Sequence, residues 1–199
     1  MNYISDILYW ISTGLLVPVI VLLIFFFGRA LLLIGSFFGQ YQSIRRTAAL
    51  LRKELDNIDS NNIRTLSDRL PKKTPSLVIT YMNRLLTTDS TAARQRLLAT
   101  FEMEADKDLS TSKTLSKMGP MLGLMGTLIP MGPALVGLST GDIASMAYNM
   151  QVAFATTVVG LFSAAIGFIT QQIKRRWYLQ DMTDLEFIAT LLNENRNNA

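Results

Sequence analysis

The sequence predicts an all-α membrane protein with three transmembrane helices, whose long helices extend into a cytoplasmic helical domain. Its 199 residues are 49% hydrophobic and have a mean hydropathy of +0.27, which is more apolar than soluble domains of this length usually are. The apolar residues form three long runs. All of the 19 Lys and Arg except Arg29 lie in 45–117 or 174–196, beside these runs. This charge pattern is typical of membrane proteins that keep basic residues on the cytoplasmic side.

The composition argues against catalysis. The chain has no Cys and no His, which removes thiol and imidazole nucleophiles, disulfides and the usual zinc ligands. We therefore predict no catalytic residue, no metal site and no enzyme activity. The pI near 9.5 would also suit a nucleic-acid-binding protein. Because the basic residues flank apolar runs, membrane lipid is the predicted partner and nucleic acid is not.

The first apolar run, residues 7–38, is longer than one crossing of the bilayer requires. At about 1.5 Å per residue it exceeds the roughly 30 Å hydrocarbon core. Within the segment 1–39 we place the span near residues 10–30, with the rest emerging as helix. Arg29, the only charge in the run, is expected to reach toward the inner surface, although a charge facing a pore is an alternative. The run lacks the basic n-region of a cleavable signal peptide.

The second and third spans lie in 118–173. They cover 118–138 and 147–173, and the basic triplet 174–176 closes the third. The positive-inside rule gives the orientation, because the first six residues and the link 139–145 each carry one Asp and no basic residue. We predict a multi-pass protein of the cell (inner or plasma) membrane, with the N-terminus outside and the C-terminus inside.

The cytoplasmic helical region, 40–117, should contain several helices. Apolar residues at helical spacing predict a helix over 42–57, and a further helix is predicted over 76–87. Between them, the NIDSNN stretch at 57–62 and the PKKTP stretch at 71–75 predict loops.

Two longer helices should connect the spans to this region. One begins after Asp89 or Ser90, which are plausible N-caps, and runs into the second span because no Gly or Pro interrupts 90–118. The other is the C-terminal segment 174–199, predicted as an amphipathic cytoplasmic helix that packs between subunits or against the cytoplasmic bundle. Its apolar face consists of Tyr178, Met182, Leu185, Ile188 and Leu192.

The second and third spans each carry a stripe of small residues at spacings of three and four. In the second span the stripe is Gly119, Gly123, Gly126, Pro130, Pro133 and Gly137. In the third span it is Ala153, Thr157, Gly160, Ala164 and Gly167. Close helix packing is the commonest use of small residues in membranes. Pro130 and Pro133 add another feature, because each leaves a backbone carbonyl that needs a partner inside the bilayer. The stripes therefore face either a partner helix or an inner channel.

Threonines accompany both stripes. Thr127 lies beside the first, and Thr156 lies next to Thr157 of the second. The hydroxyls of Thr127 and Thr157 can bind water on the stripe side, although a membrane threonine often bonds its own helix backbone instead. Together, hydroxyls, small residues and freed carbonyls favour a narrow polar seam.

Two sequence motifs resemble a known family. GPMLGLMGTLIPM at 119–131 and VAFATTVVGLFSAAIGF at 152–168 resemble the two characteristic spans of the MotA/TolQ/ExbB proton channel family. The resemblance covers most of the chain and is sharpest over 117–170. The predicted topology, with its large cytoplasmic insertion between the first two spans, is also similar.

The resemblance implies a homopentamer whose second and third spans line a central pore. The pore would hold helices of a one-span partner of the ExbD, TolR or MotB type, whose Asp carries H⁺ or Na⁺; no cofactor is implied. By motif position Thr127 and Thr157 correspond to pore-facing threonines, and we assign Thr156 and Pro130 to the same ion pathway. ExbB and TolQ proteins have a Glu at the position of Val152, whereas MotA-type members lack it. No span of this chain contains a carboxylate.

Three functions remain open from the sequence. The leading hypothesis is the pore-forming subunit of a membrane motor driven by an ion-motive force. The alternative is a structural scaffold that only oligomerises through small-residue helix faces. A self-sufficient channel or carrier is the least favoured, because its spans would need titratable groups. Asp142 in the outer link can concentrate cations near a pore mouth, but a solvated loop acid is the simpler interpretation.

Overall fold

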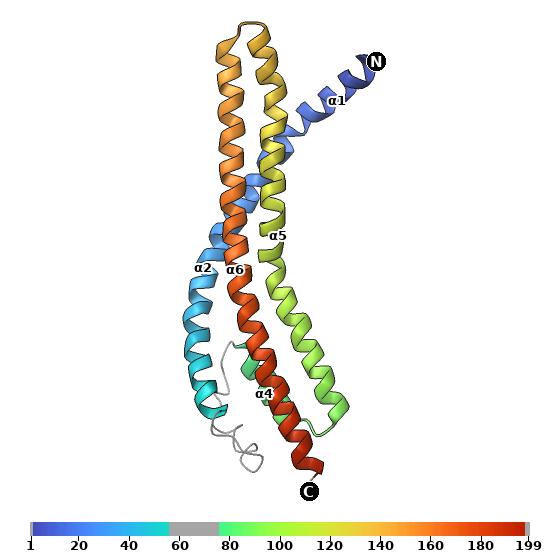
Figure 1. Cartoon of the computed structure of the whole chain (residues 1–199), viewed down its shortest axis with the longest axis vertical. Helices are drawn as coiled ribbons and strands as arrows, with labels where there is room; N and C mark the ends of the chain where they lie inside the picture. The colour runs from blue at the N-terminus through green and yellow to red at the C-terminus, as the bar shows by residue number, and fades with distance from the viewer. Residues whose placement is uncertain (1, 56–75, 198–199) are drawn as a thin grey trace. The chain divides into compact units, whose positions relative to one another are not determined.

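The protein is all-α. A computed structural model describes residues 2–55 and 76–197, and every element within these ranges is an α-helix (Figure 1). The helices are α1 (Asn2–Gly14), α2 (Leu16–Leu55), α4 (Leu77–Thr87), α5 (Thr91–Ser139) and α6 (Ile143–Asn197). Three helical stretches are long and apolar enough to cross a membrane: Ile7–Gln42, Thr91–Ser139 and Ile143–Glu194. This confirms an all-α membrane protein with three candidate spans.

The helices predicted between the first two spans are present where the structure describes them. The helix expected over 42–57 is the end of α2 and continues to Leu55, and the helix expected over 76–87 is α4. The expected loops at 57–62 and 71–75 lie outside the described residues.

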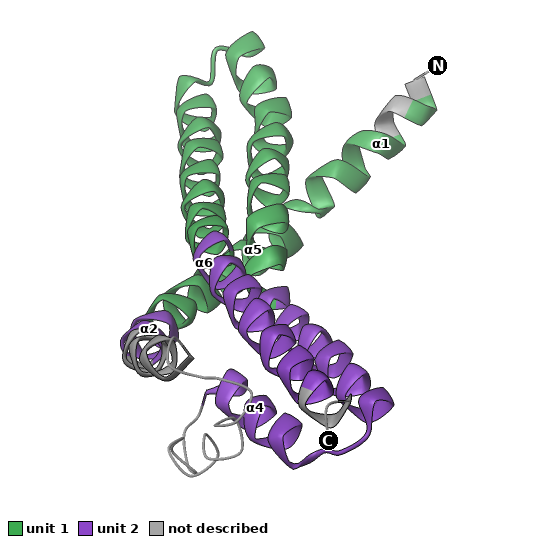
Figure 2. Cartoon of the chain, turned by 60° about the horizontal axis from the view of Figure 1, so that its bottom comes forward, with its two compact units in different colours: residues 1–35, 111–171 green, residues 36–110, 172–199 purple. Residues whose placement is uncertain are grey.

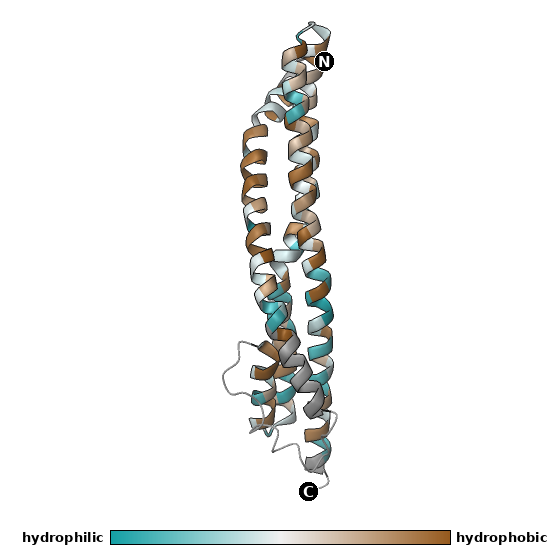
Figure 3. Ribbon diagram, turned by 90° about the vertical axis from the view of Figure 1, so that its left-hand side faces the viewer, coloured by the Kyte–Doolittle hydropathy of each residue, from teal (hydrophilic) through white to brown (hydrophobic). Residues whose placement is uncertain are grey.

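The chain folds as two compact units, which Figure 2 distinguishes by colour. Unit 1 consists of residues 1–35 and 111–171, and unit 2 consists of 36–110 and 172–199. Helices α2, α5 and α6 each contribute to both. Figure 3 shows mainly apolar residues along the parts of these helices in unit 1, and more polar residues along their parts in unit 2.

Helices α1 and α2 are separated by a break at Leu15. The Leu15 N–H is shared between the carbonyls of Ile11 and Ser12, at 3.1 Å each, and the helix resumes with Val19 donating to Leu15. Pro18 lies at the third position of α2, where its missing N–H cannot bond the Gly14 carbonyl. The apolar character of residues 7–38 does not predict this break, because it is continuous on both sides.

Helix α5 is continuous from Thr91 through the predicted second span, as expected from the absence of Gly and Pro in 90–118. It remains helical through Pro120, Pro130 and Pro133. A short turn then joins α5 to α6. Gly141 has a φ of +74°, the Asp142 N–H donates to the Gly137 carbonyl at 2.8 Å, and the Gly141 N–H donates to Leu138 at 3.3 Å. This is the Schellman pattern, in which glycine tolerates the left-handed conformation.

Asp142 then caps α6. Its Oδ1 accepts a hydrogen bond from the backbone N–H of Ser145 at 3.0 Å, satisfying one of the free donors at the helix start. This gives the acid of the link a local structural role.

The core of unit 2 is built from α4, α5 and α6. Its buried members are Val78, Ile79, Tyr81, Met82, Leu85, Phe101, Leu185, Ile188 and Leu192, with Tyr178 and Met182 packed against them. The five residues predicted as the apolar face of the C-terminal helix are therefore all part of this core. The helix packs against α4 and α5 of its own chain.

Candidate functional site

The small-residue stripes of α5 and α6 meet each other within unit 1. A methyl group at Gly160 would lie 2.7 Å from the Gly119 carbonyl oxygen and 2.9 Å from the Gly123 Cα. A methyl group at Gly119 would lie 2.7 Å from the Gly160 carbonyl oxygen. These atoms belong to backbone, so the two helices are in direct main-chain contact and have no room for a side chain between them.

The contact continues in both directions along the pair. Toward the start of the second span, a methyl group at Gly167 would lie 2.7 Å from the Ser116 nitrogen and 2.9 Å from the Ser112 oxygen. In the other direction, a methyl group at Gly126 would lie 2.6 Å from the Cβ and Oγ1 of Thr156. The stripe thus packs α5 against α6 inside one chain.

The remaining stripe residues follow the same pattern of burial. Ala153 and Ala164 are buried, Pro130 is fully buried and Pro133 is half-buried. Gly137 packs at the turn, where a methyl group would lie 3.0 Å from the Asp142 carbonyl oxygen.

The three candidate threonines occupy different environments. Thr156 is buried, and its hydroxyl is within hydrogen-bond distance of the carbonyls of Val152, at 3.0 Å, and Ala153, at 2.9 Å. Thr127 and Thr157 are half-buried. Their hydroxyls donate to the carbonyls of Leu124, at 2.8 Å, and Ala153, at 3.0 Å.

These hydrogen bonds define what each hydroxyl can do. A hydroxyl that donates to a carbonyl keeps lone pairs that can accept a hydrogen bond from water or coordinate a cation. At Thr156 the neighbouring Gly126 covers the oxygen. The side chains of Thr127 and Thr157 are partly exposed. The Thr157 backbone lies beside Gly123, and Gly123 is one helical turn before Thr127 in α5. The helix pair therefore presents two hydroxyl oxygens as weak polar ligands.

The family model described as the MotA/TolQ/ExbB proton channel family matches residues 50–186. The chain belongs to this family. The match contains both spans that form the close helix pair, and it confirms the resemblance inferred from 119–131 and 152–168. The members of this proton channel family are transport subunits and not enzymes.

One relative of this MotA/TolQ/ExbB-family chain is a protein of Methanothermobacter thermautotrophicus described as a biopolymer transport protein ExbB homolog. The two are 35% identical over 92 residues, which are 46% of this chain and 32% of the relative. The chain thus matches about a third of the length of that relative.

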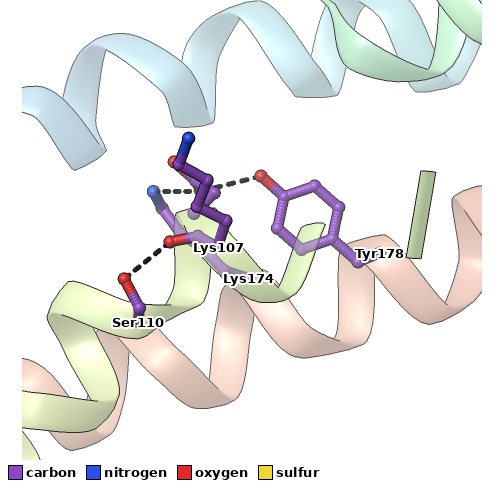
Figure 4. A network of polar contacts seen from close by, with 5 residues as sticks. Lys107, Ser110, Lys174 and Tyr178 are labelled. Carbon is purple, nitrogen blue, oxygen red and sulfur yellow. Dashed lines mark hydrogen bonds and ion pairs between the residues drawn. The ribbon is translucent and has the colours of Figure 1, made fainter. Parts of the chain in front are cut away.

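Unit 2 of this chain also contains a polar cluster that the sequence did not predict (Figure 4). The Lys174 Nζ lies 2.8 Å from Oδ2 of Asp108, and the Tyr178 hydroxyl donates to the same oxygen at 2.7 Å. Lys174 belongs to the basic triplet that closes the third span. Its side chain is buried, whereas those of Arg175 and Arg176 are exposed. Burial, and then the hydrogen bond to Asp108, raise the pKa of Tyr178, so this side chain stays a neutral donor.

A second acidic residue of unit 2, Asp181, should make the stability of this protein depend on pH. Asp181 lies in α6 beyond the apolar run that ends at Ile173, and burial together with the Asp184 charge raises its pKa from 3.8 to about 7. Because the folded-state pKa is raised, the neutral acid contributes stability that is complete below pH 3.8 and is lost as the pH rises through about 7.

We therefore expect Asp181→Asn to raise the free energy of unfolding at pH 8 by on the order of 1–2 kcal/mol, with little effect at pH 4. The measurement is thermal unfolding in detergent at both pH values. Glu186→Gln, at an exposed position of the same helix, is the control. An equal effect of Asp181→Asn at both pH values would contradict the assignment.

Proposed function

We propose that the chain is the pore-forming subunit of an ion-motive-force-driven motor in the cell membrane. It would work with a one-span, Asp-bearing partner of the ExbD, TolR or MotB type and convert the flow of H⁺ or Na⁺ into mechanical work. The observation that carries the proposal is that a member of a proton channel family has no carboxylate in any span. The polar side chains of its second and third spans end in hydroxyl and amide groups.

The chemistry of proton transfer explains why such a chain needs a partner. A proton moves between titratable groups or along water, and a threonine hydroxyl does not titrate in a useful range. Thr127 and Thr157 can orient water or contribute one ligand to a partly dehydrated cation. The group that binds and releases the ion must then come from another subunit, and a one-span helix with an Asp would supply it.

The geometry of the helix pair bears on the alternative, a scaffold that only oligomerises through small-residue faces. The glycines that such a scaffold would use are occupied between α5 and α6 of the same chain. The faces left exposed on the pair carry large apolar residues: Met121, Leu124, Leu128, Leu135, Phe154, Val158, Leu161 and Phe168. In a homopentamer, contacts between copies and with lipid would use these faces. This arrangement supports the motor proposal over the scaffold, because the small-residue faces are already in contact within one chain.

The name of the Methanothermobacter relative favours transport of a macromolecule as the process that the ion flow energises. Because this chain matches about a third of that relative, we propose this role only on the basis of the matched region.

Native mass spectrometry of the gently solubilised protein tests the assembly. We expect five copies of the chain, and two further one-span chains when a candidate partner is co-expressed. A monomer or dimer that does not bind any such candidate would overturn the motor proposal.

Ion flux tests the role of the hydroxyl. In vesicles that contain the assembled complex, Thr157→Val should lower ion flux by about tenfold, equivalent to ~1.4 kcal/mol in the barrier. Thr183→Val is the matched control, because the Thr183 hydroxyl makes the same bond to a carbonyl four residues earlier in α6, at 3.0 Å, outside the spans. Equal flux in the parent and in both variants would show that Thr157 has no part in the ion pathway.

A further inference from the structure

Helix α1 separates its residues into two faces. Ile4, Ile7 and Ile11 recur at spacings of three and four, and Leu8 and Trp10 flank them on either side. Ser12 and Thr13 fall on the opposite side by helical spacing. Such a division is typical of a helix that lies at a boundary between an apolar and an aqueous phase.

The apolar face of α1 has no partner among the described residues of unit 1. The exposed fractions are 69% for Ile4, 59% for Ile7 and 77% for Trp10. The contact of α1 with α5 is made instead by Tyr9, whose ring atom Cε2 lies 3.9 Å from where a methyl group at Gly132 would be. Tyr9 lies on the polar side of α1 by helical spacing, so the apolar face points away from α5. Figure 1 shows α1 diverging from the α5–α6 pair.

The length of α2 shows that α1 is not needed to cross the bilayer. From Leu16 to Phe38, the apolar part of α2 has a length of about 34 Å at about 1.5 Å per residue. This is enough for the roughly 30 Å hydrocarbon core without any residue of α1. The break at Leu15 therefore falls where the first span should reach the membrane surface.

We propose that α1 lies along the membrane–water interface and anchors the start of the first span to lipid through its apolar face. Tyr3 and Trp10 support this placement, because aromatic rings with a polar atom are favoured at the level of the headgroups. The first span then covers 16–38, later in the chain than the 10–30 expected from the sequence. This places Arg29 well inside the span and about nine residues before its end.

Spin labels at single cysteines test the proposal without background, because the chain contains no cysteine. Ile4→Cys, Ile11→Cys and Ser12→Cys variants would be labelled in the full chain in lipid vesicles. Label depth follows from its accessibility to oxygen, which concentrates in lipid, and to a water-soluble nickel chelate. The thermal unfolding midpoint and the assembly size of each variant show that it is folded as the parent is.

For an interfacial helix, the labels at Ile4 and Ile11 lie at the same shallow depth, and the neighbouring label at Ser12 is more accessible to the nickel chelate. For a helix that continues across the bilayer, Ile4 and Ile11 differ in depth by about 10 Å while Ile11 and Ser12 differ little. That result would overturn the proposal. It would also be overturned if both labels on the apolar face were inaccessible to both reagents, because a second copy of the chain would then cover this face.

Discussion

Gly160→Ala is expected to destabilise the protein by about 1–3 kcal/mol, the usual cost of forcing an extra group into a packed interface. The added methyl group would meet the Gly119 carbonyl oxygen at 2.7 Å and the Gly123 Cα at 2.9 Å. Both atoms are backbone, so no side-chain rotation can relieve the clash. Helices α5 and α6 would have to move apart, which weakens their contact along the whole pair. The measurement is unfolding of the detergent-solubilised protein by heat or denaturant.

The chain provides matched controls for this prediction. A methyl group at Gly28 would meet nothing within 4 Å, and one at Gly132 would meet only the Tyr9 ring, at 3.9 Å. Alanine at either position should be neutral or stabilising by up to about 1 kcal/mol, because glycine costs more conformational entropy in a helix. If all three variants lost the same stability, close packing of the stripes would not be the cause.

Asp108→Ala is expected to cost about 3 kcal/mol, because it leaves the ammonium group of Lys174 buried without a counter-charge. The two sides of the pair are not equivalent. The Lys174 side chain is 5% exposed and the Asp108 side chain is 37% exposed. Lys174→Met should therefore cost less, since the remaining carboxylate still reaches water and the Tyr178 hydroxyl.

A double-mutant cycle in unfolding free energy measures the coupling. The cycle uses Asp108→Leu, Lys174→Met and the combination of these two substitutions. The combination replaces the pair by apolar groups of similar volume, and we expect it to be close to the parent in stability. Tyr178→Phe, which removes the second donor to Asp108, should cost about 1 kcal/mol. If the changes in unfolding free energy of the two single substitutions simply add in the double variant, Asp108 and Lys174 are not coupled.

The helices of this protein could be predicted because their signals are local. A stretch without Gly or Pro predicts that α5 runs unbroken into the second span, and the 3.6-residue period of Tyr178, Leu185 and Leu192 identifies the buried face of α6. The family, too, could be recognised from two short motifs. In each case the evidence lies within a few turns of one helix.

The candidate site could be predicted only in part. Sequence spacing places Gly119, Gly126 and Gly160 on stripes, and it leaves open whether the stripes face a channel or a helix. The pairing of the two stripes depends on the register of the α5–α6 hairpin, which the turn at Gly141 sets. A turn has this effect because it fixes which residues of two antiparallel helices lie side by side.

Long-range contacts account for the remaining differences. Lys174 is one of three consecutive basic residues, and its burial follows from Asp108, 66 positions earlier in the chain. Thr156 and Thr157 are adjacent residues of α6, yet only Thr156 is covered by Gly126 of α5. Sequence periodicity identifies the face on which a residue lies. Only the fold brings that face against a particular neighbour, and burial, charge pairing and the reach of a hydroxyl all depend on that neighbour.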